Sequence, residues 1–193
     1  MKKVLSLDIS SSTIGWSVIR MHNSGKIYLD SFGHVKPPSK SAADKKGFGL
    51  SYRLNETSIH MKNLVTKIKP NFVVVEDYAK KFSRGKSSAN TIIILATVNE
   101  IVSLECFKHM KKEVVRMPVS RVRKFIKEKY SKTPLNKEEI MPLMSTLFEG
   151  FVPTLNKVGN IKKECYDEAD ALAVGLAFCI ERIGSEDLII CQK

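Results

Sequence analysis

Four acidic residues stand where their carboxylates could act together. Asp8 follows an apolar run near the N-terminus, and Glu76 ends the apolar run VVVE. Asp167 and Asp170 are three residues apart, which would place both on one face of a helix, with Cβ atoms about 5–6 Å apart. Converging carboxylates repel one another unless they are protonated or bridged by a cation, and Mg²⁺ prefers oxygen ligands of this kind. The four acids therefore predict a site for a hard divalent cation.

Two such cations about 3.5–4 Å apart stabilise both the attacking and the leaving oxygen when a phosphodiester bond is cleaved. We therefore expect phosphodiester hydrolysis, with Mg²⁺ as the cofactor, Mn²⁺ as the alternative, and two ions in each active site. Each acid taken alone has a simpler explanation, because acids often end a strand or complement the dipole at the start of a helix. Their joint placement in a basic chain is what favours the metal site.

The pattern of apolar residues indicates the elements that must position these acids. Alternation predicts strands at 2–8, 14–20 and 26–33, joined by short turns into an antiparallel meander. A continuous apolar run predicts a buried strand at 72–75. If the strand at 72–75 lies beside the first strand, Asp8 and Glu76 share one rim of the sheet. The remaining segments are predicted as helices at 50–68, 89–107, 119–130, 137–149 and 167–182, a strand at 113–117, and loops at 34–48 and 150–163.

This order of elements is that of an α/β fold. Its mixed sheet contains an antiparallel three-stranded meander followed by alternating strands and helices. The four cysteines show no paired spacing, so we expect reduced thiols. The N-terminal apolar run is short and holds Asp8, so no secretory signal is predicted. The sequence has no stretch of about 18 uninterrupted apolar residues, so no membrane span is predicted. We expect a cytoplasmic protein that is not secreted.

The net charge of +12, from 32 Lys and Arg against 20 Asp and Glu, suits a polyanionic partner, nucleic acid before membrane. The excess is concentrated in two places. Residues 108–137 hold eleven Lys and Arg against two Glu, and residues 80–86 hold four against none. A solvated basic surface is the simpler explanation, but clustering on this scale favours nucleic acid.

Candidate nucleic-acid contacts lie in three segments. Tyr78 and Phe82 stand among cations, where aromatic rings can stack on unpaired bases while the cations hold phosphates, although packing within the protein is the alternative. The other two segments are the Ser/Thr turn after Asp8 and the basic helix predicted at 119–130. The full set of candidates is Ser11, Ser12, Tyr78, Lys80, Lys81, Phe82, Arg84, Lys86, Arg121, Arg123, Lys124 and Lys127.

Four segments, taken in order, resemble the RuvC-like Holliday junction resolvases of the RNase H-like nuclease superfamily. LSLDISSSTIGWSVI (5–19) resembles the first motif of the family, a strand with a catalytic Asp, a small-residue turn and a Gly-aromatic strand. The segment that begins VVVEDYAKKF (73–102) is similar to the second motif, and CYDEADALAVGLA (165–177) to the third. Between them, VVRMPVSRVRKFI (114–126) matches the family's short strand, its Pro and its basic helix. The ordered set covers most of the chain.

This resemblance implies the RNase H-like fold in a single nuclease domain over 1–184, followed by a short C-terminal tail at 185–193. It implies that Asp8, Glu76 and the pair Asp167 and Asp170 are the metal-binding catalytic acids of a structure-specific endodeoxyribonuclease of the crossover junction type, which serves DNA recombination and repair. It also implies a homodimer that cuts two strands of a four-way DNA junction symmetrically.

The sequence departs from the family pattern at three places. Ser10 stands where Gly is usual after the first Asp, and Tyr166 stands where His often precedes the last acids. Residues 131–137 lack the glycines that bacterial members often carry. These departures bear on sequence preference and junction selectivity, and they indicate a divergent branch, such as one from a phage or virus. The resemblance therefore implies the cytoplasm of a bacterium or of a cell infected by a phage or virus.

Two alternatives stay open. A nuclease of the same fold could act on RNA, on RNA–DNA hybrids or on other branched DNA. A non-catalytic, structure-specific nucleic-acid-binding protein is the second alternative, and the intact set of four acids argues against it. The two-fold symmetry of a four-way junction favours two chains. In the mostly apolar helix at about 91–105, Ile93, Ile94 and Val98 are candidate interface residues, and burial within one subunit is the other explanation.

Overall fold

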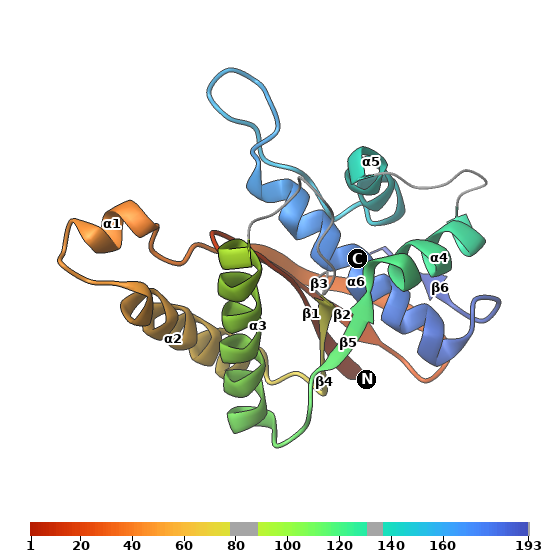
Figure 1. Ribbon diagram of the computed structural model, residues 1–193. Helices are drawn as coiled ribbons and strands as arrows, with labels where there is room; N and C mark the ends of the chain where they lie inside the picture. The colour runs from red at the N-terminus through yellow and green to blue at the C-terminus, as the bar shows by residue number, and fades with distance from the viewer. Residues whose placement is uncertain (78–88, 131–136, 193) are drawn as a thin grey trace.

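The computed structural model describes residues 1–77, 89–130 and 137–192, which form an α/β structure with a six-stranded sheet between two helical layers (Figure 1). The strands are β1 (Lys2–Ile9), β2 (Ile14–Met21), β3 (Lys26–Val35), β4 (Phe72–Asp77), β5 (Val115–Pro118) and β6 (Ile189–Ile190). The helices are α1 (Lys40–Asp44), α2 (Leu50–Ile68), α3 (Ala89–Met110), α4 (Val119–Tyr130), α5 (Lys137–Leu147) and α6 (Glu164–Ile183).

The sheet has the strand order β5-β4-β1-β2-β3-β6. Strands β1, β2 and β3 are antiparallel neighbours, which confirms the predicted meander. Strand β4 pairs with β1 in parallel, and β5 pairs with β4 in parallel. The neighbouring positions of β1 and β4 confirm the condition under which Asp8 and Glu76 share a rim of the sheet.

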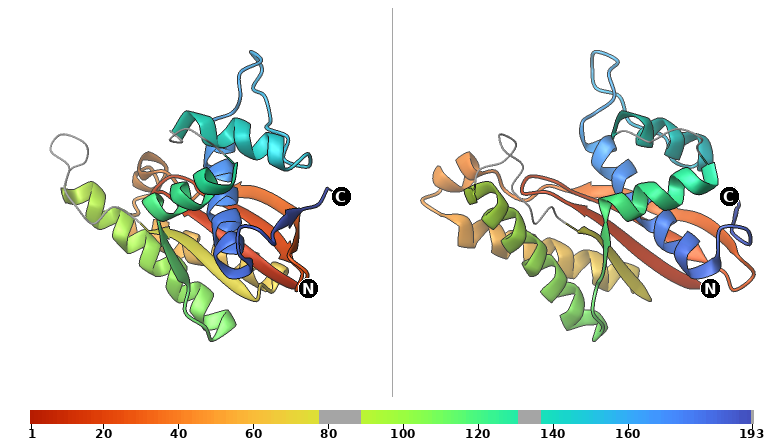
Figure 2. Two further views of the ribbon diagram at one scale, coloured as in Figure 1. Left: turned by 90° about the vertical axis from the view of Figure 1, so that its right-hand side faces the viewer. Right: turned by 45° about the vertical axis from the view of Figure 1, so that its right-hand side comes forward.

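Helices cover both faces of the sheet. Helix α6 crosses β1 and β2 on one face, with α4 and α5 packed beside it, while α2 and α3 cover the other face (Figure 2). The alternation within a strand supplies both cores, because Val4 of β1 packs into the α6 layer and Leu5 into the α2–α3 layer. Helix α6 is buried over most of its length, which fits a central helix.

Most elements shift from their predicted bounds by no more than three residues, and three differences have an identifiable local reason. The expected loop 34–48 contains the one-turn helix α1, in which the Ser39 side chain accepts a hydrogen bond from the Ala42 amide. Helix α6 begins at Glu164 rather than at residue 167, since Lys163 is no capping residue by type. In the expected tail 185–193, two residues form β6 and pair with β3, and a strand of this length shows no alternation.

Helix α3 corrects part of the interface prediction. Val98 is 4% exposed and belongs to the core between α3 and the sheet, so naming it as interface surface was wrong. Ile94 packs partly against the same core, whereas Ile93 is 62% exposed. Among the described residues, α3 is also a helix long and apolar enough to span a membrane by length and composition. A core helix meets the same criterion, and α3 packs on α2 and on the sheet.

Candidate active site

Asp8 and Glu76 lie on the α6 face of the sheet at the ends of neighbouring strands. Along β1 the side chains alternate between the two layers, and Asp8 has the same parity as Val4, which packs toward α6. Glu76 has the same relation to Val74 in β4. The residues that immediately precede the two acids are register partners. Both acids therefore stand at the carboxyl ends of two parallel strands, where open α/β sheets bind their ligands.

Gly15 allows α6 to bring the other two acids to the same rim. It is the register partner of Asp8 on β2, and a Cβ atom at this position would lie 2.1 Å from the carbonyl oxygen of Asp167. The backbone of α6 therefore lies directly on β2 beside Asp8. Asp170 is three residues further on, so it lies on the same side of the helix as Asp167.

The charges of the four acids act on one another. The pKa of Asp8 is raised well above its ordinary value of 3.8, and burial of the carboxyl is the largest cause. The negative charges of Glu76, Asp170 and Asp167 follow in that order, and a hydrogen bond with Glu76 raises this pKa further. The ends of β1 and β4 and the helix α6 thus concentrate negative charge at one point.

This donor set fits a hard divalent cation, because every donor is a carboxylate oxygen and the charges of Glu76, Asp170 and Asp167 all act on Asp8, an accumulation of negative charge that a cation relieves. Within residues 1–77, 89–130 and 137–192, no three acids, histidines or cysteines are close enough to enclose a metal ion by themselves. Such enclosure is not required of a Mg²⁺ site, which typically takes one or two carboxylates and completes its shell with water and substrate phosphate.

Cavities flank the acids on both sides. One of about 230 Å³ is lined by Glu76, Asp170 and Arg123, together with apolar residues of α4, α5 and α6. The other, of about 450 Å³, joins the turn after β1 to the start of α6 and is lined by Ser10, Ser12, Thr13, Lys36, Lys163, Glu164 and Asp167. Cations thus stand on either side of the acids, and hydroxyls stand on the Asp167 side. A larger cavity of about 870 Å³ lies at the opposite end of β1, around Lys2.

The turn between β1 and β2 is closed by Ser10, at the position where the family usually has Gly. Its hydroxyl donates to the carbonyl of Thr13 (2.7 Å) and accepts from the Thr13 amide (2.9 Å). The carbonyl of Ser11 accepts a hydrogen bond from Arg53 (2.8 Å). Ser12 is exposed and lines the cavity beside Asp167. Of the two predicted serine contacts, Ser12 is thus the one that faces this cavity.

The basic residues of α4 differ in their surroundings. Arg123 lines the cavity that contains Glu76, so it lies nearest to the acids. Arg121 forms an ion pair with Glu181 of α6 and lies over the ring of Phe125. The positive charge of Arg121 is thus already paired within the protein. Lys124 and Lys127 are both exposed, and Lys124 lies 3.9 Å from Glu128. The candidates Tyr78, Lys80, Lys81, Phe82, Arg84 and Lys86 lie outside the described residues.

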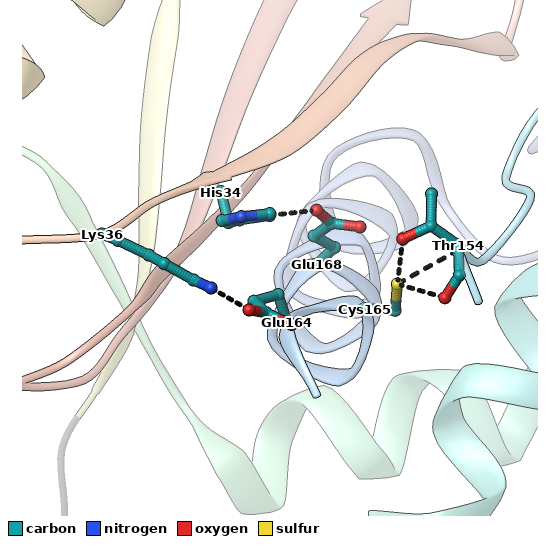
Figure 3. A network of polar contacts seen from close by, with 6 residues as sticks. All are labelled: His34, Lys36, Thr154, Glu164, Cys165 and Glu168. Carbon is teal, nitrogen blue, oxygen red and sulfur yellow. Dashed lines mark hydrogen bonds and ion pairs between the residues drawn. The ribbon is translucent and has the colours of Figure 1, made fainter. Parts of the chain in front are cut away.

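Sequence reasoning missed His34 and Glu168, which tie β3 to α6 beside the acids (Figure 3). Glu168 stands between Asp167 and Asp170 in the sequence, and its side chain is buried. Its Oε1 atom lies 2.6 Å from Nδ1 of His34. His34 is the register partner of Gly15, so Asp8, Gly15 and His34 form one row across three strands. A Glu inside an Ala-rich segment is the only signal in the sequence, and nothing local identifies a partner 134 residues away.

Two further contacts hold the first turn of α6 (Figure 3). Lys36, just after β3, pairs with Glu164, and its hydrogen bond lowers the pKa of that carboxyl. Cys165 is buried, and its Sγ atom lies 3.3 Å from the amide and 3.4 Å from the hydroxyl of Thr154. The end of α6 that carries Asp167 is therefore fixed by β3 on one side and by the preceding loop on the other.

A curled mixed sheet with a central helix and acids at this rim is the RNase H-like architecture. No protein-family model and no curated protein matches the sequence. Solved structures of resolvases match over nearly the whole chain. RuvC of T. thermophilus in complex with a Holliday junction substrate has a TM-score of 0.67 and 17% identity, and the match covers 96% of this chain and 98% of that one.

One eukaryotic and one viral resolvase also match over nearly the whole chain. The yeast mitochondrial Holliday junction resolvase Ydc2 has a TM-score of 0.62 and 10% identity, with 96% and 80% of the two chains covered. The fowlpox virus resolvase in complex with Holliday junction DNA has a TM-score of 0.52 and 13% identity, with 94% and 99% covered. The fold of this chain is the RNase H-like fold of RuvC, as the sequence resemblance implied.

Proposed function

We propose that this protein is a metal-dependent endonuclease that cleaves branched DNA, with the four-way junction as its substrate. The observation that carries the proposal is the convergence of Asp8, Glu76, Asp167 and Asp170 at one rim of the sheet, where three charges act on the first acid. The fold supports it, because the structures that it resembles include two resolvases in complex with Holliday junction DNA.

In this proposal the four carboxylates hold Mg²⁺, with Mn²⁺ as the alternative. When bound, the cations supply the positive charge that stabilises the attacking and leaving oxygens of the phosphodiester. Asp8 and Glu76 stand at the ends of paired strands, which keeps their oxygens in place. A bound cation would favour the ionised form of Asp8, since a carboxylate must be ionised to act as a ligand. Asp167 and Asp170 complete the donor set from a helix fixed to β3.

Cations beside the acids would hold the DNA strand on either side of the scissile bond. Arg123 stands on the Glu76 side, and Lys163 stands on the Asp167 side. Phosphates held at both points would place the bond between them over the acids, which is how orientation contributes to rate. The segment 78–86 is the proposed contact to unpaired bases at the branch, by its aromatic and basic residues.

Symmetric cutting of a four-way junction requires two active sites related by a two-fold axis, and we propose that two chains provide them. Ile93, Leu104 and Phe107 of α3 are exposed, and their spacing places them on one side of the helix. Ile93 lies near the start of this side of α3 and Leu104 and Phe107 lie near its end, with the exposed Glu100 between them. Exposed apolar residues of this kind suit burial against a second chain. Ile93 thus remains from the predicted interface set.

A comparison of substrates tests the proposal. End-labelled four-way junction, linear duplex and RNA–DNA hybrid are incubated side by side with the protein and Mg²⁺. The proposal predicts paired, symmetric cuts in the junction and little cleavage of the other two substrates. Preferential cleavage of the hybrid would assign the site to a different substrate, and binding without any cleavage would identify a non-catalytic binding protein.

A further inference from the structure

A hairpin loop projects from the molecule directly before α6. Residues 152–163 extend beyond the body of the protein in every view, next to the end of α6 that carries Asp167 (Figures 1 and 2). Leu155 and Ile161 form an isolated antiparallel bridge across the loop. The projecting part therefore has two antiparallel arms joined by a tip at residues 156–160.

The tip is held in shape by its own backbone and by one side chain. The amide of Asn156 donates to the carbonyl of Asn160 (2.7 Å), and Oδ1 of Asn156 accepts from the amides of Val158 (2.9 Å) and Asn160 (3.0 Å). Gly159 has a φ of 87°, a conformation that glycine adopts at no steric cost. Hydrogen bonds of this number in five residues define one conformation of the tip.

The root of the hairpin is anchored in the core beside the acids. Phe151 is 1% exposed and meets the ring of Phe32 edge to face, with centroids 4.8 Å apart. Thr154 contacts the buried Cys165, which lies two residues before Asp167. The hairpin and the acid therefore share one anchor, and the position of one relative to the other is fixed.

The surface of this hairpin is apolar and basic at once. Val158 at the tip is 83% exposed, and Val152 and Leu155 are 68% and 57% exposed. Lys157 and Lys162 are also exposed. The exposed parts of these aliphatic side chains gain no hydrophobic stabilisation until a partner covers them. The adjacent lysines favour a polyanion as the covering partner over a neutral protein surface.

We propose that this hairpin is a DNA-binding element that places Leu155 and Val158 against unstacked bases at the branch point, with Lys157 and Lys162 on the flanking phosphates. The inference rests on the proposed function. In a continuous duplex the faces of the bases are stacked and hidden, so aliphatic side chains find apolar partners only where the stack is opened. A branch point is such an opening, and the hairpin stands beside the acids that would cut near it.

The test compares Leu155→Ser/Val158→Ser with the wild type and with the control Ile59→Ser, which changes an exposed aliphatic residue on α2. Affinities for a four-way junction and for a linear duplex of the same sequence are measured by anisotropy in EDTA. We expect the double variant to bind the junction roughly tenfold more weakly, with less than a twofold effect on the duplex, because burial of two aliphatic side chains contributes on this order. The control should bind both as the wild type does.

A second measurement reports the contact itself. With 2-aminopurine at the branch point, the wild type should change the fluorescence of the base, and the double variant should lose most of that change. If the wild type prefers the junction and the double variant keeps both the preference and the fluorescence change, the hairpin has no such role while the proposed function stands. If the wild type shows no preference for the junction, the proposed function fails and this inference with it. A fall in the mass of the double variant would assign the hairpin to contact with a second copy of the chain, which also overturns the inference.

Discussion

Replacement of Gly15 by Ala tests how α6 is positioned over the acids. The new Cβ atom would lie 2.1 Å from the carbonyl oxygen and 2.3 Å from the carbonyl carbon of Asp167, whereas ordinary contact begins at 3.4 Å. The helix must therefore retreat from β2 by about 1.3 Å, because backbone atoms cannot rotate away as a side chain can. Asp167 moves with it, away from Asp8.

The expected effects on stability and on activity differ in size. Overpacking of this kind costs about 1–3 kcal/mol of the free energy of unfolding. A displacement of about 1 Å at a catalytic centre lowers the rate by about 10²-fold. The free energy is measured by urea unfolding, and the rate by single-turnover cleavage of a four-way junction at a temperature where both proteins are folded.

Gly175→Ala is the matched control, since it adds the same atom under the same helix. Its Cβ would meet side chains rather than backbone, 2.5 Å from Oγ of Ser6 and 3.1 Å from Cδ1 of Ile19. The Ser6 hydroxyl would have to turn away from its buried hydrogen bond to Ser17, which costs stability but does not require the backbone of α6 to move. Ala in the helix also regains about 1 kcal/mol of helix propensity. We expect cleavage within a few-fold of the wild type. Full activity in Gly15→Ala, or an equal loss in both variants, would refute the argument that Gly15 positions Asp167.

Three other predictions follow from the charges and the surface. Asp8→Asn should have a higher free energy of unfolding than the wild type in metal-free buffer near pH 7. The raised pKa of Asp8 in the folded protein makes the stability of the wild type fall as the pH rises from about 3.8 toward that pKa, by at most about 1.4 kcal/mol per pH unit. Identical unfolding free energies of the two proteins across this pH range would contradict the prediction. Lys124→Ala/Lys127→Ala should flatten the log–log salt dependence of DNA affinity by nearly two units, and an unchanged slope would make this face solvated surface only. Ile93→Asp should convert a dimer into a monomer of 21.7 kDa in light scattering while Ile59→Asp does not. A wild type that is 21.7 kDa alone and binds the junction with one chain per DNA molecule would exclude the dimer.

The acids on the sheet could be predicted from the sequence because their position follows from short-range rules. Alternation within a strand fixes the face of Asp8 and Glu76, and a spacing of three places Asp167 and Asp170 on one side of a helix. These rules need no knowledge of distant residues. The sheet pairing that brings the first two together was a condition in the prediction, and the structure meets it.

Features that depend on distant partners could not be predicted in the same way. Glu168 looks like any acid near a helix start, and its burial makes sense only with His34, which lies on another strand. Helix α3 is apolar on most sides, so its sequence does not separate Val98 in the core from Ile93 on the surface. The strand β6 has two residues and is defined by its pairing with β3 alone.

The most direct test of the account is cleavage of a four-way junction by the wild type and by Asp8→Asn, each with Mg²⁺ and with EDTA, with the cut sites mapped on all four strands. The wild type with Mg²⁺ should make two cuts related by the symmetry of the junction. Asp8→Asn should bind the junction at least as tightly and cut nothing, since the variant loses a ligand and a negative charge. Cleavage by Asp8→Asn at the wild-type rate, or by the wild type in EDTA, would contradict the four-acid metal site.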